Sequence, residues 1–489
     1  MPTEPADAEL LCLSASELAR RIRSRQLTSV QAVDAHIRRA QSTHAAINAI
    51  VAERYTQARA EAAAADQLLA TAGTVGLPPL HGVPCTIKEC FAFAGMPNTA
   101  GLVSRRNVPI STDAVTVTRI RQAGAIPIGV TNTSELCMWL ESSNRVYGRT
   151  NNPYDRRCMV GGSSGGEGAI VASGASPFGL GSDVGGSIRL PGHFCGVFGH
   201  KCSSGMIPNS GQYPPPTAKT SEMLSAGPLC RKAEDLWPLI RLLAGPDGAD
   251  TVCEARQLGD PAHVDVSKLR VFVIDKMAVQ PVTAGQRRGL GNAVEALRQR
   301  GAQVKPITFK GIGEGFLLWS QRLSAASPET FHMLLGGDGD QPDLAAELAK
   351  WMRGKSAHTL PALGLAALEK IPFLAGGDVT AAMAKIADLR KRIEDTLGDD
   401  GVIVQPTFPR QAPRHHWPLL RPLESGWTGV YNALQLPATQ VPTGLYGGLP
   451  TGVQIVGRHG NDHVTVAVAL ALEQALGGWV APWTVPGGI

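Results

Sequence analysis

The chain has 489 residues, 43% of them hydrophobic, and it contains 55 glycines and 35 prolines. This length and composition are typical of a large globular enzyme with many tight turns, and they exclude a disordered protein. The formal net charge of +5 is spread along the chain without basic blocks, so nothing points to a nucleic-acid partner.

The first eleven residues, MPTEPADAELL, contain neither the basic stretch nor the apolar stretch of a secretion signal. No apolar run later in the chain reaches the ~20 residues that span a bilayer, so we expect no integral membrane segment. The nine cysteines are odd in number and include no Cys-x-x-Cys pair. This usage favours a reducing compartment over a disulfide-bonded secreted state, and we expect a cytoplasmic protein.

The region before residue 76 has the pattern of a set of helices. Ser14-Ala-Ser-Glu17 has the form of a capping box, in which a serine caps a helix and a glutamate bonds back to it. Apolar residues then recur at helical spacing between Leu18 and Ile47, and 52–71 is rich in alanine and charged residues. We therefore predict an N-terminal helical region over 1–75, followed by one main domain over 76–489.

Apolar strand segments alternate with amphipathic helical segments through the rest of the chain. We predict strands over 85–88, 125–130, 269–274, 303–308, 401–404 and 453–456, and helices over 114–123, 231–244, 284–300 and 462–475. Strands that alternate with helices usually lie parallel in one sheet, joined by crossover helices. The alternation therefore predicts a largely parallel β-sheet.

The region 311–376 differs from its surroundings because large apolar side chains stand among mixed polar residues. They include Phe316, Trp319, Phe331 and Trp351. Such side chains either line a substrate cleft or pack in the interior, and the sequence leaves both alternatives open.

The stretch 159–199 contains two clusters of serine flanked by glycine. The first is Gly161-Gly-Ser-Ser-Gly-Gly166, and the second is Gly185-Gly-Ser187. Glycine has no Cβ, so it lets a substrate approach main-chain N–H groups. The repeated pattern predicts hydroxyl and amide groups arranged around a reacting carbonyl or a phosphate.

Other kinds of site fit parts of this sequence. A phosphate loop is disfavoured because the Gly-Lys-Ser/Thr ending is missing after the first cluster. The α/β-hydrolase pattern Gly-x-Ser-x-Gly is met at Ser163 and at Ser164, and Asp462 with His463 would complete a triad. That alternative stays open at this point.

Pairs of histidines raise the further alternative of a metal site. His459 and His463 have the spacing of two ligands on one helix face, but a glycine follows His459 where a zincin has glutamate. No third ligand is evident. The neighbouring pair His415 and His416 fits a solvated loop.

Lys88 closes the apolar strand 85–88 and offers another way to activate a serine. A lysine at this place either extends its amine to the surface or holds it in a dry site. A serine hydroxyl needs a base at hand before it attacks an amide carbonyl, and burial favours the neutral, basic form of a lysine. A second serine could then carry the proton between the amine and the nucleophile.

Three motifs stand in order along the chain: GVPCTIKECF over 82–91, GGSSGGEGA over 161–169 and GLGSDVGGSIR over 179–189. With them the chain resembles the amidase signature family and, within it, the fatty acid amide hydrolase branch. The resemblance covers roughly residues 15–489, including GLPTGVQIVGR over 448–458. It implies an α/β fold, with a single large domain in which a central mixed, mostly parallel β-sheet is covered by helices on both faces.

By this resemblance the catalytic residues are Lys88, Ser163 and Ser187. Ser187 would be the nucleophile, Ser163 the bridging serine after a cis peptide bond, and Lys88 the base that finally takes the proton. The reaction implied is hydrolysis of a carboxylic amide to acid plus amine or ammonia through an acyl-serine intermediate. It requires no metal or organic cofactor.

The resemblance also assigns roles to neighbouring residues. The oxyanion hole is implied to consist of the main-chain N–H groups of Val184, Gly185, Gly186 and Ser187. Asp183 and Arg189 are implied to brace the loop as a pair, and Ser164 to support it by hydrogen bonding.

The implied partner is a small-molecule amide, and a homodimer is the family expectation. The branch suggests long acyl amides, whereas the apolar region 311–376 fits an aryl amide equally. The family also contains the A-type subunits of tRNA-dependent amidotransferases, which pass ammonia to an activated acyl group within a complex. A protein of that type stays an alternative, as does an α/β-hydrolase-type serine esterase, although Glu89 and Glu167 in the first two motifs favour the stand-alone hydrolase branch.

Overall fold

The computed structural model describes residues 5–277, 280–337, 339–369 and 378–489. Its centre is an eleven-stranded mixed sheet, in the order β1-β3-β2-β6-β8-β7-β12-β13-β11-β9-β10. The strands are β1 Ile50–Glu53, β2 Pro84–Lys88, β3 Ile126–Thr131, β6 Phe178–Asp183, β7 Phe198–Lys201, β8 Ser225–Cys230, β9 Arg270–Val273, β10 Gln303–Pro306, β11 Gly401–Pro406, β12 Ala438–Tyr446 and β13 Leu449–Val456. A small separate pair is formed by β4 Ser143–Asn144 and β5 Gly148–Arg149.

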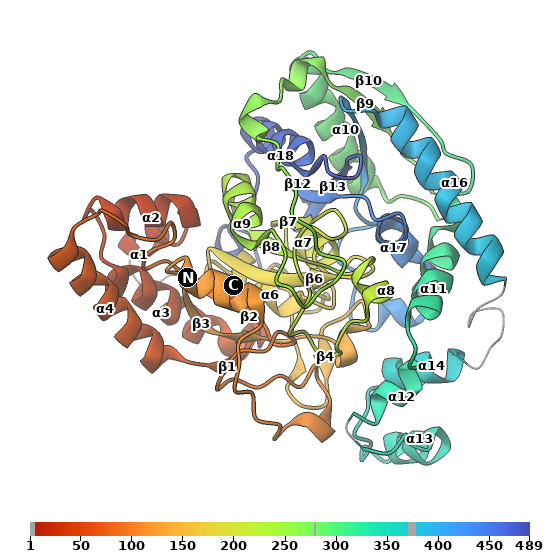
Figure 1. Cartoon of the computed structure of the whole chain (residues 1–489), viewed down its shortest axis with the longest axis horizontal. Coiled ribbons are helices and arrows are strands. Elements are labelled where there is room, and N and C mark those ends of the chain that lie inside the picture. The colour runs from red at the N-terminus through yellow and green to blue at the C-terminus, as the bar shows by residue number, and fades with distance from the viewer. Residues whose placement is uncertain (1–4, 278–279, 338, 370–377) are drawn as a thin grey trace.

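Helices flank the sheet, as expected for the single large α/β domain (Figure 1). They are α1 Pro5–Leu10, α2 Ala15–Arg23, α3 Ser29–Ile47, α4 Tyr55–Ala72, α5 Val115–Gln122, α6 Gly165–Ala172, α7 Arg189–Phe194, α8 Ala218–Ser221, α9 Leu236–Leu243, α10 Ala284–Gln299, α11 Gly315–Ala326, α12 Phe331–Leu335, α13 Leu344–Met352, α14 Leu360–Leu368, α16 Val379–Leu397, α17 Gly426–Ala433 and α18 Asp462–Leu476. Among these described helices, none has both the length and the apolar character needed to cross a bilayer.

The sheet is less parallel than the alternation of strands and helices predicts. Within the described residues, four neighbouring strand pairs run parallel and six run antiparallel. One cause is the hairpin of β12 and β13, which turns at Gly447 and Gly448 with φ angles of 59° and 81°. Two successive positive φ angles suit the tight turn of an antiparallel hairpin.

The N-terminal region is helical as predicted, with one strand that the prediction missed. β1 pairs antiparallel with β3 and so adds this region to the edge of the sheet. Ser14 caps α2 by accepting the N–H of Glu17, but the Glu17 carboxylate bonds to Arg20 and Arg21 instead of returning to the cap. The domain boundary at residue 75 stays a prediction.

The region 311–376 forms helices α11 to α14 along one side of the molecule, as far as it is described (Figure 1). A separate apolar cluster joins α12 and α14 to the loops below the sheet. Its buried members are Leu102, Leu136, Phe331, Leu335, Ala362 and Ala366. All nine cysteines of the chain are free thiols, and the cytoplasmic location stays a prediction.

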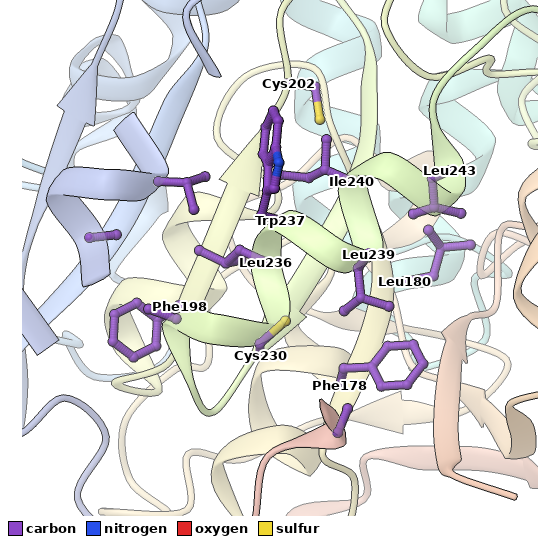
Figure 2. Close-up of a cluster of buried hydrophobic side chains, with 14 of the residues drawn as sticks. Phe178, Leu180, Phe198, Cys202, Cys230, Leu236, Trp237, Leu239, Ile240 and Leu243 are labelled. Atoms are coloured by element: carbon purple, nitrogen blue, oxygen red, sulfur yellow. The ribbon is translucent and has the colours of Figure 1, made fainter. Parts of the chain in front are cut away.

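Helix α9 shows how the sheet acquires its core. Leu236, Leu239, Ile240 and Leu243 recur at intervals of three and four residues and lie on one face of the helix. Figure 2 shows them packed with Phe178, Leu180 and Phe198 of the strands beneath. Burying one such side chain stabilises the fold by about 1.5–3 kcal/mol.

We predict that Ile240→Ala destabilises the protein by about 2–5 kcal/mol, because it leaves a cavity between α9 and the sheet. Urea denaturation followed by tryptophan fluorescence measures the change. Arg241→Ala, on the exposed side of the same helix, is the control and should stay within about 0.5 kcal/mol of the unsubstituted chain. Equal effects of the two substitutions would contradict this account of the core.

Candidate active site

Lys88 stands at the end of β2, a strand whose five residues are all buried between β3 and β6. Its amine donates to the hydroxyl of Ser163 at 2.7 Å and to that of Ser182 at 3.0 Å. The Lys88 side chain is wholly shielded from solvent. Of the two alternatives for this lysine, the dry site is therefore confirmed and the surface position is wrong.

Two buried carboxyl groups lie close to Lys88, but both bond to neutral donors. Glu167 accepts the hydroxyls of Thr86 at 2.6 Å and Thr131 at 2.8 Å, and burial raises its pKa to about 8. Glu89 accepts the hydroxyl of Tyr147 at 2.7 Å, and burial raises its pKa to about 7. In the described part of the chain no carboxylate forms an ion pair with the Lys88 amine, whose hydrogen bonds go to two hydroxyl groups.

Ser163 lies in a turn that is held from outside by residues 139–142. The peptide bond between Gly162 and Ser163 is cis, as the resemblance implies. A Cβ on Gly162 would stand 2.3 Å from the carbonyl oxygen of Trp139, so only glycine fits there. Ser142 donates to the carbonyl oxygen of Ser163 at 3.0 Å and accepts the N–H of Gly165 at 2.9 Å. The turn therefore has little freedom to move.

The two glycine–serine clusters meet through Ser164. Its N–H donates to the carbonyl oxygen of Ser187 at 3.2 Å, and its hydroxyl donates to the carbonyl oxygen of Ser182 at 3.2 Å. Ser187 is 8% exposed, whereas Ser163 is 1% exposed. Of the two predicted catalytic hydroxyls, the one at position 187 is thus nearer to solvent.

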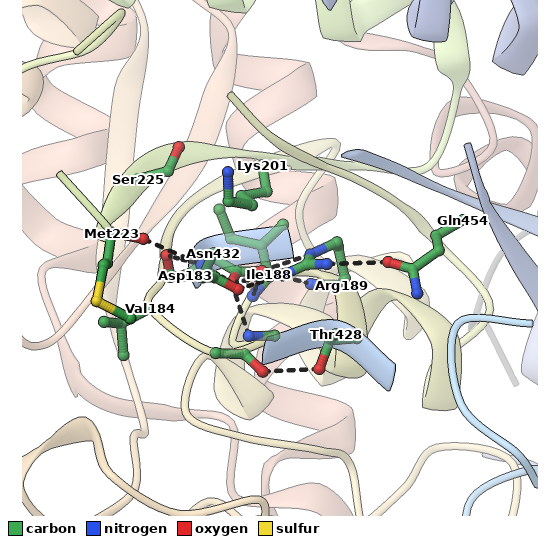
Figure 3. Close-up of polar contacts among 12 residues, drawn as sticks. Asp183, Val184, Ile188, Arg189, Lys201, Met223, Ser225, Thr428, Asn432 and Gln454 are labelled. Carbon is green, nitrogen blue, oxygen red and sulfur yellow. Dashed lines mark hydrogen bonds and ion pairs between the residues drawn. The ribbon is translucent and has the colours of Figure 1, made fainter. Parts of the chain in front are cut away.

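Asp183 and Arg189 form a fully buried ion pair beneath the loop that carries Ser187 (Figure 3). The carboxylate accepts Nε of Arg189 and the N–H of Gly186, at 3.0 and 2.7 Å. Asn432 of α17 donates to the same carboxylate at 2.9 Å. Burial alone would raise the pKa of Asp183, but Arg189 and Asn432 outweigh it and hold the pKa well below its usual range.

The loop between Asp183 and Ser187 is anchored through its carbonyl groups. Trp319 donates to the carbonyl oxygen of Val184 at 2.7 Å, and Thr428 to that of Gly185 at 2.7 Å. The N–H groups of Val184, Gly185 and Ser187 donate to no acceptor among the described residues. The N–H of Gly186, the fourth donor predicted for the oxyanion hole, is already engaged by Asp183.

The pair of Asp462 with His463, which would complete the predicted α/β-hydrolase triad, is not formed. Asp462 is buried, where it bonds to the ring of His200 at 3.0 Å and accepts the N–H of Ser203 at 2.8 Å. His463 packs instead against the ring of Trp237, with centroids 6.3 Å apart. Cys202 lies near His200 and Asp462 as a third group that could bind a metal, but the two ring nitrogens of His200 already bond to Asp462 and Thr439.

Of the histidine pair at 415 and 416, His416 is exposed, as expected for a solvated loop, but His415 is not. The ring of His415 is largely buried and pairs with Glu141, while its other nitrogen lies 3.1 Å from the carbonyl oxygen of Arg156. Burial would raise the pKa of Glu141, but the pairing with His415 lowers it overall.

Several residues around the site were missed from the sequence. Ser182, which accepts a hydrogen bond from Lys88, lies inside the motif over 179–189. Its position beside Asp183 at the end of an apolar strand could have identified it as a residue of the site. Trp319, Thr428 and Asn432 come from helices more than 130 residues further along the chain, and of these three the sequence singled out only Trp319, as an apolar side chain of the region 311–376. Such contacts have no local pattern, so the sequence carries no sign of them.

The structure thus brings the Lys88 amine and the Ser163 hydroxyl together where β2 ends, and Ser187 lies in the loop that follows β6. A family model described as Amidase matches residues 31–466. The chain belongs to the Amidase family.

Relatives and solved structures agree with this membership. The chain is 42% identical to fatty-acid amide hydrolase 2 of Homo sapiens, over 98% of the chain and 92% of that protein. It is 31% identical to the A-type subunit of the glutamyl-tRNA(Gln) amidotransferase of Legionella pneumophila (strain Paris), over 94% and 96%. A solved fatty acid amide hydrolase shares the fold with a TM-score of 0.81 and 23% identity, over 98% of this chain and 87% of that one. The resemblance to the fatty acid amide hydrolase branch is confirmed, and the chain is an amide-hydrolysing C–N hydrolase.

We predict that Arg189→Met destabilises the protein by about 3–5 kcal/mol, because it leaves the Asp183 carboxylate buried without its cation. Urea denaturation measures the loss. The double variant with Asp183→Asn should lose less than the two single variants added together, since the uncompensated charge is gone. Additive losses would show that the two side chains do not act as a pair.

Proposed function

We propose that the chain hydrolyses a carboxylic amide to acid plus amine or ammonia with a Ser-Ser-Lys triad of Ser187, Ser163 and Lys88. The observation that carries the proposal is the 2.7 Å hydrogen bond between the amine of Lys88 and the hydroxyl of Ser163 in a site closed to water. In the proposed reaction this amine acts as the base, because it is the basic group that contacts the Ser163 hydroxyl.

In the proposed reaction, neutral Lys88 takes the proton of Ser163 while Ser163 takes that of Ser187. The Oγ atom of Ser187 then attacks the amide carbon. The same path run backwards protonates the leaving nitrogen, so the amine departs and an ester on Ser187 remains. Water activated by the same base cleaves that ester and regenerates the serine.

The developing oxyanion needs donors that are already in place. The N–H groups of Val184, Gly185 and Ser187 have no other acceptor among the described residues, and the loop that holds them is anchored by its carbonyls. We assign these three as the oxyanion hole. Gly186 serves the loop instead by bonding to Asp183. Each donor of this kind typically stabilises the transition state by ~3 kcal/mol.

The proposed substrate is a small-molecule amide with an apolar acyl group. The relatives named fatty-acid amide hydrolase 2 support it. Partly exposed apolar side chains that pack against the cluster of α12, α14 and Leu136, such as Met138 and Leu334, support it too. Leu136 lies between Glu135 and Cys137, close to the turn of Ser163. A homodimer and a cytoplasmic location stay predictions.

The amidotransferase alternative predicts a different activity for the purified chain. A protein that acts only within a complex would hydrolyse no simple anilide alone, whereas the proposed enzyme does. The higher identity to fatty-acid amide hydrolase 2, 42% against 31%, favours the free-standing enzyme.

We predict that Ser187→Ala abolishes turnover, with a loss of about 10⁴-fold or more, because the nucleophile is gone. It should also end covalent labelling by a fluorophosphonate, detected as a mass shift on the intact chain. His463→Ala is the control and should change activity little. An inactive His463→Ala beside a normal Lys88→Ala would support the α/β-hydrolase alternative instead.

We predict that Lys88→Ala leaves a slow enzyme whose pH optimum lies at more alkaline pH, because hydroxide must then replace the amine as the base. Profiles of kcat/KM against pH test this. Lys201→Met is a matched control: that lysine is also buried, with a pKa lowered to about 8 by burial, but its amine donates to the carbonyl oxygens of Cys202 and Leu436. Its pH optimum should match that of the unsubstituted enzyme, and a shared shift would contradict the role of Lys88.

A further inference from the structure

The turn Glu135–Cys137 beside the candidate site has an unusual backbone. Leu136 and Cys137 both adopt left-handed conformations, with φ angles of 52° and 57°. This conformation is unfavourable for residues that carry a Cβ, and it persists where surrounding contacts impose it, often at functional sites. The contacts that impose the left-handed conformation on this turn therefore indicate its function.

The turn lies directly against the segment that carries Ser163. A Cβ on Gly162 would stand 2.7 Å from the hydroxyl of Ser134 and 2.3 Å from the carbonyl oxygen of Trp139, which flank the turn on either side. Ser134 also donates to the carbonyl oxygen of Trp139 at 2.8 Å and so closes the loop. A shift of this turn would therefore displace Gly162 and Ser163.

The other side of the turn is tied to helix α14 by a buried carboxylate. Glu135 bonds to the Nδ1 atom of His358 at 2.7 Å and accepts the N–H of Thr359 at 2.8 Å. Thr359 is the N-cap of α14, where the helix dipole favours a negative charge. Glu135 and His358 are 2% and 7% exposed, so water competes little for these bonds.

The same turn meets α12 and α14 through apolar packing. Leu136 is buried in one cluster with Phe331 and Leu335 of α12 and Ala362 of α14. These helices lie at the edge of the molecule, away from the central sheet (Figure 1). The polar tie and the apolar cluster together connect this outer layer to the wall of the candidate site.

We propose that Glu135 and His358 are positioning residues that set the preference of the enzyme for the length of the acyl group. They hold α12 and α14 at a defined place relative to Ser163, so that a long acyl chain would reach an apolar wall formed by the partly exposed side chains that pack against the buried cluster, Met138 and Leu334 among them. A short acyl group ends before that wall and gains nothing from it. The inference rests on the proposed function, because it assumes acyl transfer at Ser187.

The test compares acetyl, butyryl, octanoyl and dodecanoyl p-nitroanilides as substrates. For His358→Ala we expect KM to rise about tenfold for the dodecanoyl anilide with kcat nearly unchanged, as for a loss of binding shared by ground and transition states. Both constants for the acetyl anilide should stay within about twofold. His358→Asn, whose side-chain N–H replaces the Nδ1 donor, should restore most of the long-chain KM.

His332→Ala is the matched control within the same helical layer, because that histidine bonds to the carbonyl oxygen of Pro342 and not to the turn. It should leave the dependence on acyl length unchanged. If His358→Ala melts below the assay temperature, Glu135→Gln is the second variant, since it keeps the shape but weakens the charge-assisted bonds. It should shift the long-chain KM in the same direction by a smaller factor.

Equal changes for all acyl lengths, or none, in both His358→Ala and Glu135→Gln would overturn the inference while leaving the proposed function in place. Failure of the proposed function is seen separately in the unsubstituted chain, as absence of hydrolysis for every anilide and of fluorophosphonate labelling at Ser187. The inference would also be overturned if His332→Ala changed the dependence on acyl length as much as His358→Ala does. The whole layer of α12 and α14, and not the bond between Glu135 and His358, would then be responsible.

Discussion

The hydrogen bond from the buried Lys88 amine to Ser163 is the constraint on which the rest of the site depends. Removing an ammonium group from water is costly unless a carboxylate compensates for it. Here the central strands bring two hydroxyls to the amine, while Glu89 and Glu167 are satisfied by neutral donors. The position of β2 between β3 and β6 excludes water from all of these groups at once.

Another buried basic side chain, Arg189, has a different environment from that of Lys88. Arg189 is paired with Asp183, and the pair is completed by Asn432, so every charge is met by a partner. An arginine stays charged under all ordinary conditions, which suits a group that must hold a loop in place. A lysine can lose its proton, which suits the role of base that we propose for Lys88. Arg189 thus fixes the loop, while Lys88 is available for the proposed proton transfer.

The sequence is sufficient to predict the short-range parts of this arrangement but not the long-range ones. The strand ending in Lys88 and the glycine-flanked serines at 163 and 187 carry local signals, because backbone freedom and strand burial depend on neighbouring residues. The tie between Glu135 and His358 joins residues 223 positions apart, and neither has an unusual neighbourhood. The antiparallel share of the sheet was underestimated for a similar reason, since strand pairing follows from the whole topology.

The segment from Ser134 to Ser142 connects the turn of Ser163 to the outer helices. One carboxylate near each end is paired with an imidazole from a distant part of the chain, Glu135 with His358 and Glu141 with His415. Between them the backbone keeps its left-handed turn and presses on Gly162, while Ser142 supports the carbonyl of Ser163. A substrate that contacted the apolar layer, as we propose, would therefore act on the same segment that holds Ser163. Substitutions in this segment would then alter the fit of the acyl group without replacing any residue of the proposed triad.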